Sequence, residues 1–270
     1  MNGLKLDRRS MVAGACATAG MALGRVKLSS KKKGFCLVPK NDGEWAAKLK
    51  KLNAKWYYTW GAKEPNGSPA TAEFVPMMWG KWGCNAELMA QIRAAGHKTL
   101  LGFNEPDQKK QANISVEKAI ELWPLLMGTG ARLGSPAGVH PDGEWMIAFM
   151  DEAQRRNYRV DFITMHSYMG ANARHFLSKV EKIHKRYKKP IWITEFAVAD
   201  WTANEGQPNK HSANAVMKFM EDALPKLEKM DYVERYSWFS AAPSSHVLGT
   251  SALFAKDGTL TPLGEWYASI

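Results

Sequence analysis

Eight short runs of β-branched, aromatic and apolar residues recur along this chain of 270 residues, and amphipathic stretches separate most of them. The runs cover residues 34–38, 55–59, 73–78, 99–103, 132–135, 162–166, 191–195 and 234–239. Such alternation is typical of βαβ units, in which parallel strands are joined by helical crossovers. Eight strands are the number that closes a (β/α)8 TIM barrel, and this chain length is common for that fold.

The segments between the strands predict the helices of the barrel. Apolar residues recur at helical spacing in residues 44–52, 85–95, 115–126, 145–156, 174–187 and 213–229. Asn85 and Ser115 are suitable residues to open helices, and Pro225 predicts that the last helix kinks or ends early. Residues 60–71 are rich in Gly, Pro and Asn, which indicates a loop without a helix. We therefore predict a single α/β domain, a (β/α)8 barrel with some shortened or missing helices.

The first 30 residues have the pattern of a targeting segment. Arg8 and Arg9 precede a weakly apolar run over residues 11–23 that is rich in Ala and Gly. This order of charge and apolar run is typical of a signal peptide, and the paired arginines resemble a twin-arginine leader. The run is too short for stable membrane insertion. We predict a leader over residues 1–30, a catalytic domain over residues 31–270, and export to the periplasm or the medium.

The formal net charge is +11, which raises the question of a nucleic-acid partner. The lysines are dispersed along the predicted helices without a nucleic-acid-binding motif, so a solvated basic surface is the better interpretation. The seven histidines show no metal-type spacing, and no Gly-x-Ser-x-Gly elbow occurs. We expect no cofactor and a monomer. A disulfide between Cys36 and Cys84 stays open, since their strands are not neighbours in a barrel.

Polar and aromatic residues accumulate at the carboxyl ends of the predicted strands, which build the active site of a parallel barrel. Glu105 follows the fourth strand and Glu195 ends the seventh, on opposite sides of the barrel mouth. Two carboxylates that flank one bond are the minimal machinery for cutting a glycosidic linkage. In this hypothesis Glu195 is the nucleophile and Glu105 the acid and base. Asn104, beside Glu105, suits the sugar 2-hydroxyl.

Other strand-end residues are candidates for the same site. We expect His166 or Tyr168 to donate a hydrogen bond to Glu195 and keep it ionised. For any one tryptophan, a role in the core is the more ordinary interpretation, and for a lone histidine a structural role is as ordinary as a functional one. The two glutamates together, on strands four and seven, favour catalysis over helix caps or surface ion pairs.

Several ordered motifs resemble glycoside hydrolase family 128, the Asl1-like catalytic-core proteins of clan A. The motifs are Tyr57-Tyr58-Thr59-Trp60, Phe74-Val75-Pro76-Met77-Met78-Trp79-Gly80, Leu100-Leu101-Gly102-Phe103-Asn104-Glu105-Pro106-Asp107, Ser135-Pro136-Ala137, His166-Ser167-Tyr168 and Trp192-Ile193-Thr194-Glu195-Phe196. The resemblance implies a secreted, retaining endo-β-1,3-glucanase with Glu105 as acid and base and Glu195 as nucleophile. It also implies that Trp60, Trp79 and Trp238 shape the groove for the glucan.

Two alternatives remain. The first is a barrel that binds glycans without cutting them, against which the presence of both glutamates argues. The second is another clan A specificity, such as β-1,4-glucan, mannan or xylan. The sequence does not define glucan chain length, endo or exo action, or biological role.

Overall fold

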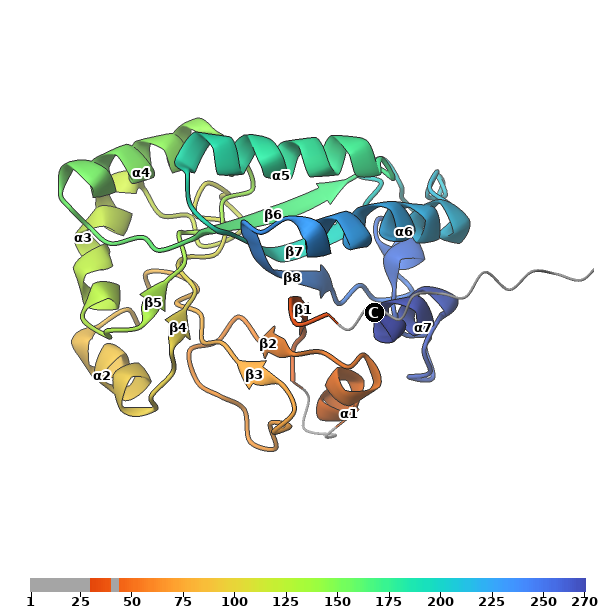
Figure 1. Ribbon diagram of the computed structural model, residues 1–270, viewed down its shortest axis with the longest axis horizontal. Coiled ribbons are helices and arrows are strands. Elements are labelled where there is room, and N and C mark those ends of the chain that lie inside the picture. Colours follow the sequence, from red (N-terminus) through yellow and green to blue (C-terminus); the bar gives the residue numbers. More distant parts are fainter. Residues whose placement is uncertain (1–29, 40–43) are drawn as a thin grey trace, which may run out of the picture.

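Eight parallel strands form a closed barrel in the computed structural model, which describes residues 30–39 and 44–270 (Figure 1). The strands are β1 (Lys33–Cys36), β2 (Trp56–Tyr58), β3 (Glu73–Phe74), β4 (Thr99–Leu100), β5 (Arg132–Leu133), β6 (Ile163–Met169), β7 (Ile191–Val198) and β8 (Val233–Phe239). Six of them pair in the order β3-β2-β1-β8-β7-β6, and β4 pairs with β5. Parallel bridges Met77–Leu101 and Gly134–Phe162 join the two groups and close the ring. The predicted eight-stranded barrel is confirmed.

Strands β3, β4 and β5 are shorter than the sequence predicted. Pro76 and Pro136 follow β3 and β5 and offer no backbone N–H to a ladder, so pairing there is reduced to isolated bridges. A Cβ atom on Gly134 would lie 2.7 Å from the ring of Phe162, so only glycine allows the close approach of β5 and β6. The strand ends at the mouth are therefore irregular segments, which isolated bridges and a few backbone hydrogen bonds join to one another.

Seven helices and one short 3-10 turn occur in the described part of the chain. They are α1 (Glu44–Lys51), α2 (Ala86–Ala94), α3 (Val116–Met127), α4 (Glu144–Arg155), α5 (Ala173–Tyr187), α6 (Ala213–Lys229), η1 (Gly249–Ser251) and α7 (Pro262–Ser269). The side chains of Asn85, Ser115 and Ser212 accept hydrogen bonds from backbone N–H groups of the helices that they open. Between β2 and β3 there is no helix, as predicted.

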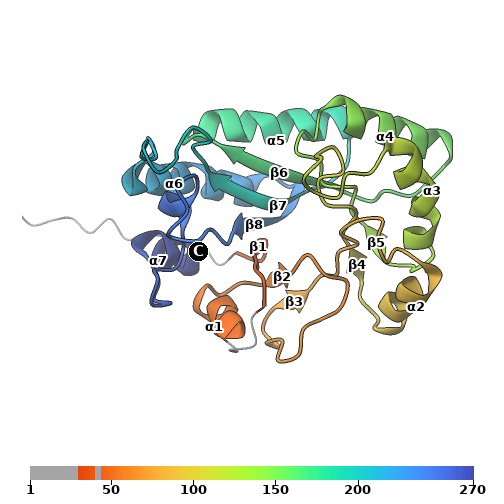
Figure 2. The same ribbon diagram turned by 180° about the vertical axis from the view of Figure 1, so that it is seen from behind.

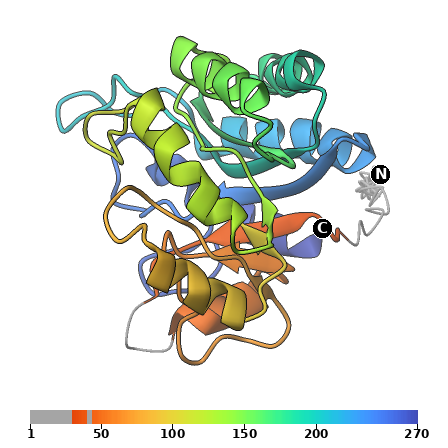
Figure 3. The same ribbon diagram turned by 90° about the vertical axis from the view of Figure 1, so that its left-hand side faces the viewer.

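The helices surround the strands. Figure 3 shows α2 and α3 on one flank, and in Figures 1 and 2 α5 runs alongside β6 and α6. Helix α6 continues through Pro225 to Lys229, so the predicted early end is wrong. Buried Leu224 and Leu227 lie on either side of the proline, and this packing outweighs the lost hydrogen bond.

Two neighbouring lysines at the start of β1 bind the carboxyl ends of two helices. The Lys32 Nζ donates to carbonyls at the end of α6, including those of Glu228 and Met230, both at 3.0 Å. The buried Lys33 Nζ donates to the carbonyls of Tyr267 at 2.6 Å and Ile270 at 2.9 Å, at the end of α7. Cations at helix carboxyl ends complement the exposed carbonyls and the helix dipole. Helix α7 has no counterpart among the helices predicted from the sequence, and this contact holds it against the amino end of β1.

Three further expectations concern the disulfide, the leader and membrane-spanning helices. Cys36 and Cys84 are both buried and free, so the open alternative of a disulfide between them is excluded. Nearly all of the predicted leader, residues 1–30, lies outside the described residues. None of the helices in residues 30–39 and 44–270 combines the length and apolar character that crossing a bilayer requires.

Candidate active site

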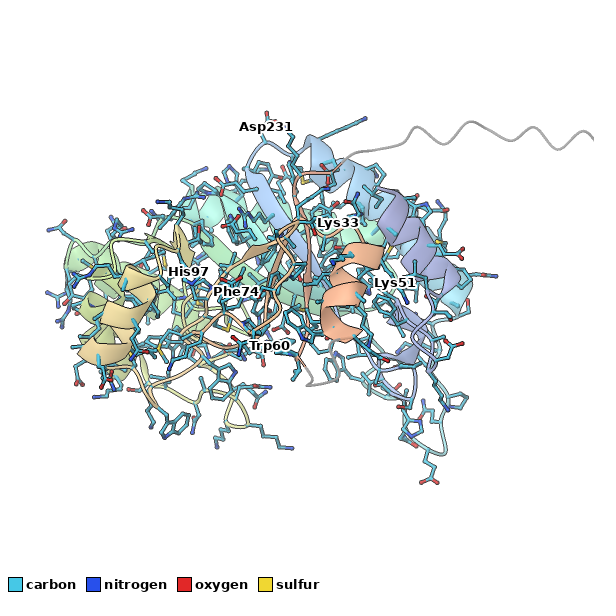
Figure 4. All side chains as sticks on the ribbon, turned by 90° about the horizontal axis from the view of Figure 1, so that it is seen from below. Lys33, Lys51, Trp60, Phe74, His97 and Asp231 are labelled. Atoms are coloured by element: carbon cyan, nitrogen blue, oxygen red, sulfur yellow. The ribbon has the colours of Figure 1, made fainter. Side chains whose placement is uncertain are left out.

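A cleft of about 830 Å³ opens at the carboxyl ends of the strands. Figure 4 labels Trp60, a residue of this cleft, at the end of the barrel away from Lys33 and Asp231, which mark the amino ends of β1 and β8. The cleft combines aromatic, amide and charged side chains. It is lined by Val38, Trp60, Trp79, Asn104, Glu105, Gln108, Lys110, Gln111, Val139, His140, His166, Tyr168, Lys179, Glu195, Trp201, Phe239 and Leu248.

Glu195 lies on β7 with its side chain only 6% exposed. Its Oε1 atom accepts hydrogen bonds from the Tyr58 hydroxyl and from Nε1 of Trp60, both at 2.8 Å. Its Oε2 atom accepts a short hydrogen bond from the Tyr168 hydroxyl. Burial and the negative charge of Glu195 raise the pKa of Tyr58 and of Tyr168 well above its ordinary value. Both phenols therefore remain protonated donors, and three donors compensate the buried carboxylate.

Glu105 follows β4 and faces the same cleft. Its backbone N–H donates to the carbonyl of Ala137 at 2.8 Å, which ties it to the segment after β5. Its φ of 41° and the φ of 59° at Trp60 lie in the left-handed region, which is unfavourable for residues with a Cβ atom. Such strain is characteristic of functional sites, where the surrounding structure holds the backbone in place. In this site it directs the Glu105 carboxylate into the cleft, together with the Trp60 side chain that donates to Glu195.

His166 of β6 lies between the two glutamates and is 1% exposed. Its Nδ1 atom lies 2.9 Å from Oε1 of Glu105 and its Nε2 atom 3.4 Å from Oε1 of Glu195. The first contact is a hydrogen bond; the second has the distance of a charge contact, but Nε2 makes no hydrogen bond to the described residues. Burial lowers the pKa of His166, but the charges of Glu195 and Glu105 and the bond to Glu105 outweigh it, so the pKa is raised.

A ring nitrogen of His166 and one oxygen of each glutamate lie within 4.8 Å of one another, a spacing that could also surround a metal ion. This grouping could not be predicted from sequence spacing, because the three residues are far apart in the chain. Oε1 of Glu195 already accepts two hydrogen bonds, which use both of its lone pairs, and Oε2 accepts a third. The arrangement suits an ionised carboxylate held by donors better than a metal ligand.

The structure brings most of the predicted site residues together. Asn104, Trp60, Trp79, His166 and Tyr168 line the cleft with both glutamates. The Asn104 side chain is buried; its Nδ2 donates to Gln111 at 3.4 Å, and its Oδ1 has no partner among the described residues.

The prediction for Trp238 is wrong, because its side chain is fully buried and faces the helix layer. Its Nε1 donates to the carbonyl of Ser251 at 2.8 Å, and its ring meets that of Phe196 edge-on at 4.9 Å. The next residue, Phe239, lines the cleft instead. Neighbouring residues of a strand point to opposite faces, so the alternation along β8 was the signal that could have found this difference.

Several cleft residues escaped the sequence analysis. Gln111 and Trp201 lie in loops and Lys179 lies on α5, and their local sequence does not say which side chains turn toward the cleft. Tyr58, which is buried and donates to Glu195, was also missed. For Tyr58 the signal was present, because it is two residues before Trp60 and period two places both on one face.

A (β/α)8 barrel with two facing carboxylates, one beyond β4 and one on β7, in a cleft lined by aromatic rings, defines the class of the glycoside hydrolases. The model of one family, the glycosyl hydrolase catalytic core, matches residues 34–267. The chain belongs to this family. It is also 31% identical over 249 residues to alkali-sensitive linkage protein 1 of Schizosaccharomyces pombe, with 89% of this chain and 45% of that protein covered. It thus spans less than half of that relative's length.

Solved structures of glycoside hydrolase family 128 share the fold. A subgroup I endo-β-1,3-glucanase from Amycolatopsis mediterranei, in complex with laminaritriose, is 38% identical with a TM-score of 0.78, covering 89% of this chain and 99% of that chain. Mutants of that enzyme at either of two glutamates also hold laminari-oligosaccharides. A subgroup II endo-β-1,3-glucanase from Sorangium cellulosum is 27% identical with a TM-score of 0.73, covering 88% and 98% of the two chains.

Proposed function

We propose that this protein is a retaining endo-β-1,3-glucanase that uses Glu195 as nucleophile and Glu105 as general acid and base. The observation that carries the proposal is the separation of the carboxylates, with one oxygen of each within 4.8 Å of the other. Retaining enzymes hold their carboxyl groups about 5–5.5 Å apart, whereas inverting enzymes leave about 6.5–9.5 Å for a water molecule. The observed spacing favours attack by a carboxylate over attack by water.

In the first step, the Glu195 carboxylate attacks the anomeric carbon, and the bond between that carbon and the glycosidic oxygen breaks. Glu105 gives its proton to that departing oxygen, so the shortened glucan leaves as a neutral alcohol. In the second step, Glu105 takes a proton from water, whose oxygen attacks the same carbon and displaces Glu195. The hydrogen bonds from Tyr58, Trp60 and Tyr168 orient the Glu195 carboxylate for attack and stabilise it as the leaving group.

Two neighbours support this chemistry. His166, at 2.9 Å from Glu105 and 3.4 Å from Glu195, orients the acid and places positive charge between the two carboxylates. Asn104 offers a buried oxygen without a partner in the described residues, which suits the hydroxyl next to the anomeric carbon. A hydrogen bond to that hydroxyl strengthens in the transition state.

The substrate class rests on the cleft lining and on the family. Trp60, Trp79, Tyr168, Trp201 and Phe239 present aromatic rings to the cleft, as expected for a chain of sugars with C–H-rich faces. The related glucanases that hold laminari-oligosaccharides favour the β-1,3 linkage over the β-1,4 alternatives.

The experiment is reducing-sugar release from linear β-1,3-glucan by the purified protein, with Glu195→Ala alongside. We expect release by the wild type, and loss of release with retained binding in the variant. If neither the wild type nor the variant releases sugar but both bind the glucan, the result would favour a glycan-binding barrel without activity. If there is neither sugar release nor binding, the β-1,3 assignment would be overturned. The same assay on β-1,4-glucan, mannan and xylan would then identify the substrate.

We further propose that the protein is exported and acts as a monomer. The support for export is the order of Arg8-Arg9 and the apolar run in the first 30 residues. Amino-terminal sequencing of the protein recovered from the periplasm or the medium tests this. Recovery of the full chain from the cytoplasm alone would contradict it.

A further inference from the structure

Apart from the two glutamates, the charged side chains that line the cleft are positive. Apart from Glu105 and Glu195, no carboxylate from the described part of the chain lines it, whereas Lys110 and Lys179 do. A plain glucan carries only hydroxyl groups and has no need of ammonium groups along its path. The two lysines therefore call for a separate explanation.

A second cavity, of about 610 Å³, adjoins the cleft and shares Lys179 with it. Basic residues of α5 dominate its lining, namely Arg174, Lys179 and Lys182. The carboxylate in this lining, Asp142, is paired with Lys182 at 2.8 Å. Two cations of the cavity are thus left over, and Lys179 is the one that also faces the cleft.

Lys179 is half-buried and lacks a counter-ion. Within the described residues, its ammonium group forms no ion pair and no side-chain hydrogen bond. Burial and the charge of Lys182 lower the pKa of Lys179, and the attraction of Asp142 does not cancel their effect. A cation in this position is partly desolvated without a hydrogen-bonded counter-ion, so an anion bound beside it would gain a stronger interaction than at an open surface.

We propose that the Lys179 end of the cleft binds an anionic substituent, a carboxylate or a phosphate, carried by the glucan chain. The inference rests on the proposed function, because the chain that fills the cleft presents the substituent to Lys179. Arg174 and Lys182 extend the basic surface in the adjoining cavity, which gives the substituent room outside the cleft. The site selects among glucans and takes no part in bond cleavage.

The test compares two substituted linear β-1,3-glucans of equal substitution, one carboxymethylated and one hydroxyethylated, which differ in charge and little in size. At low salt we expect the wild type to favour the carboxymethyl polymer in kcat/KM by about fivefold, the upper end of the range for an exposed charge pair, because Lys179 is half-buried. The preference should fall toward unity in about 0.5 M NaCl, because salt screens the contact. Phosphorylated glucan serves as the second anionic probe and shows whether phosphate is preferred to carboxylate.

Lys179→Met is expected to remove most of the preference, because it should lower kcat/KM on the carboxymethyl polymer much more than on the hydroxyethyl polymer. The matched control is Lys185→Met, which makes the same change on the same helix at a lysine paired with Glu181. It should keep the wild-type preference. Binding of both polymers to Glu195→Ala, with and without Lys179→Met, repeats the comparison without turnover.

An equal response of both lysine variants would overturn the proposal, since it would reflect net charge alone. So would a wild type that cleaves or binds the two polymers equally well. Failure of the proposed function looks different, because neither polymer would then be cleaved while the comparison of binding remains readable.

Discussion

Nδ1 of His166 lies 2.9 Å from Oε1 of Glu105, and this hydrogen bond links β6 to the segment after β4 across the floor of the cleft. The other nitrogen of the ring faces Glu195 at 3.4 Å. A histidine cation in this position compensates the negative charge that is buried at the site.

The raised pKa of His166 predicts how stability depends on pH. The folded protein holds this proton more tightly than the unfolded chain, whose histidine titrates near pH ~6.5. The stabilisation is therefore complete below that pH and is lost as the pH rises through the folded pKa. We expect the difference in unfolding free energy between wild type and His166→Asn to be larger at about pH 6 than at about pH 9. Urea unfolding followed by tryptophan fluorescence measures it; a difference independent of pH would refute the charged state.

Tyr58→Phe removes one donor from Glu195 and keeps the ring in its buried place. A hydrogen bond to a charged group contributes about 1.5–3 kcal/mol, so kcat should fall roughly 10- to 100-fold. The control is Tyr57→Phe, on the same strand, whose hydroxyl donates to Ser68 away from the cleft. Steady-state kinetics on linear β-1,3-glucan compares the two. Equal losses would mean that the effect comes from the strand and not from the contact with Glu195.

Much of the fold could be predicted from local sequence, because each strand is a short apolar run and each crossover has its own helical period. The ends of β3, β4 and β5 could not, since Pro76, Pro136 and close interstrand contacts decide the pairing there. Helix α7 was also missed. Lys33 and the barrel floor hold it in place, and this contact joins the two ends of the domain.

The site was predictable as far as strand ends define it. Glu105 and Glu195 follow apolar runs, and the barrel then brings them to one mouth. The role of His166 as a bridge depends on a distance between strands, which no local pattern contains. Trp238 and Phe239 are adjacent, yet Trp238 lies in the core and Phe239 lines the cleft, because neighbouring residues of β8 point to opposite faces.

The opposite orientations of Trp238 and Phe239 predict different consequences for their substitution by alanine. Trp238→Ala removes a fully buried ring and should cost about 3–5 kcal/mol of unfolding free energy. Phe239→Ala removes ring contacts with Trp60 at 6.0 Å and Tyr168 at 5.3 Å, each contributing about 0.5–1.5 kcal/mol. It should lower kcat/KM, with a smaller loss of stability than Trp238→Ala. Chemical denaturation and kinetics on both variants check this, and the reverse order would contradict the assignment of the faces.

Glu105→Gln tests the acid role through the leaving group. The amide cannot protonate the departing oxygen, so cleavage of unactivated glucan should fall by about 10²–10⁴-fold. An aryl β-glucoside oligomer with a good leaving group needs little protonation, and its first step should be much less affected. Burst kinetics with a nitrophenyl laminari-oligosaccharide measures that step. Equal losses on both substrates would argue against Glu105 as the acid.

The close approach of the carboxylates, with one oxygen of each within 4.8 Å of the other, predicts the stereochemistry of the product. Two successive displacements at the anomeric carbon each invert it, so the first-formed reducing end should have the β configuration of the glucan. Proton NMR recorded within the first minutes of hydrolysis, before mutarotation, separates the two anomeric signals. Glu195→Ala with added azide provides a second reading, because a small nucleophile on the vacated face should yield the α-glycosyl azide from an activated substrate. An initial α anomer in the wild-type reaction would exclude Glu195 as nucleophile and assign the attack to water.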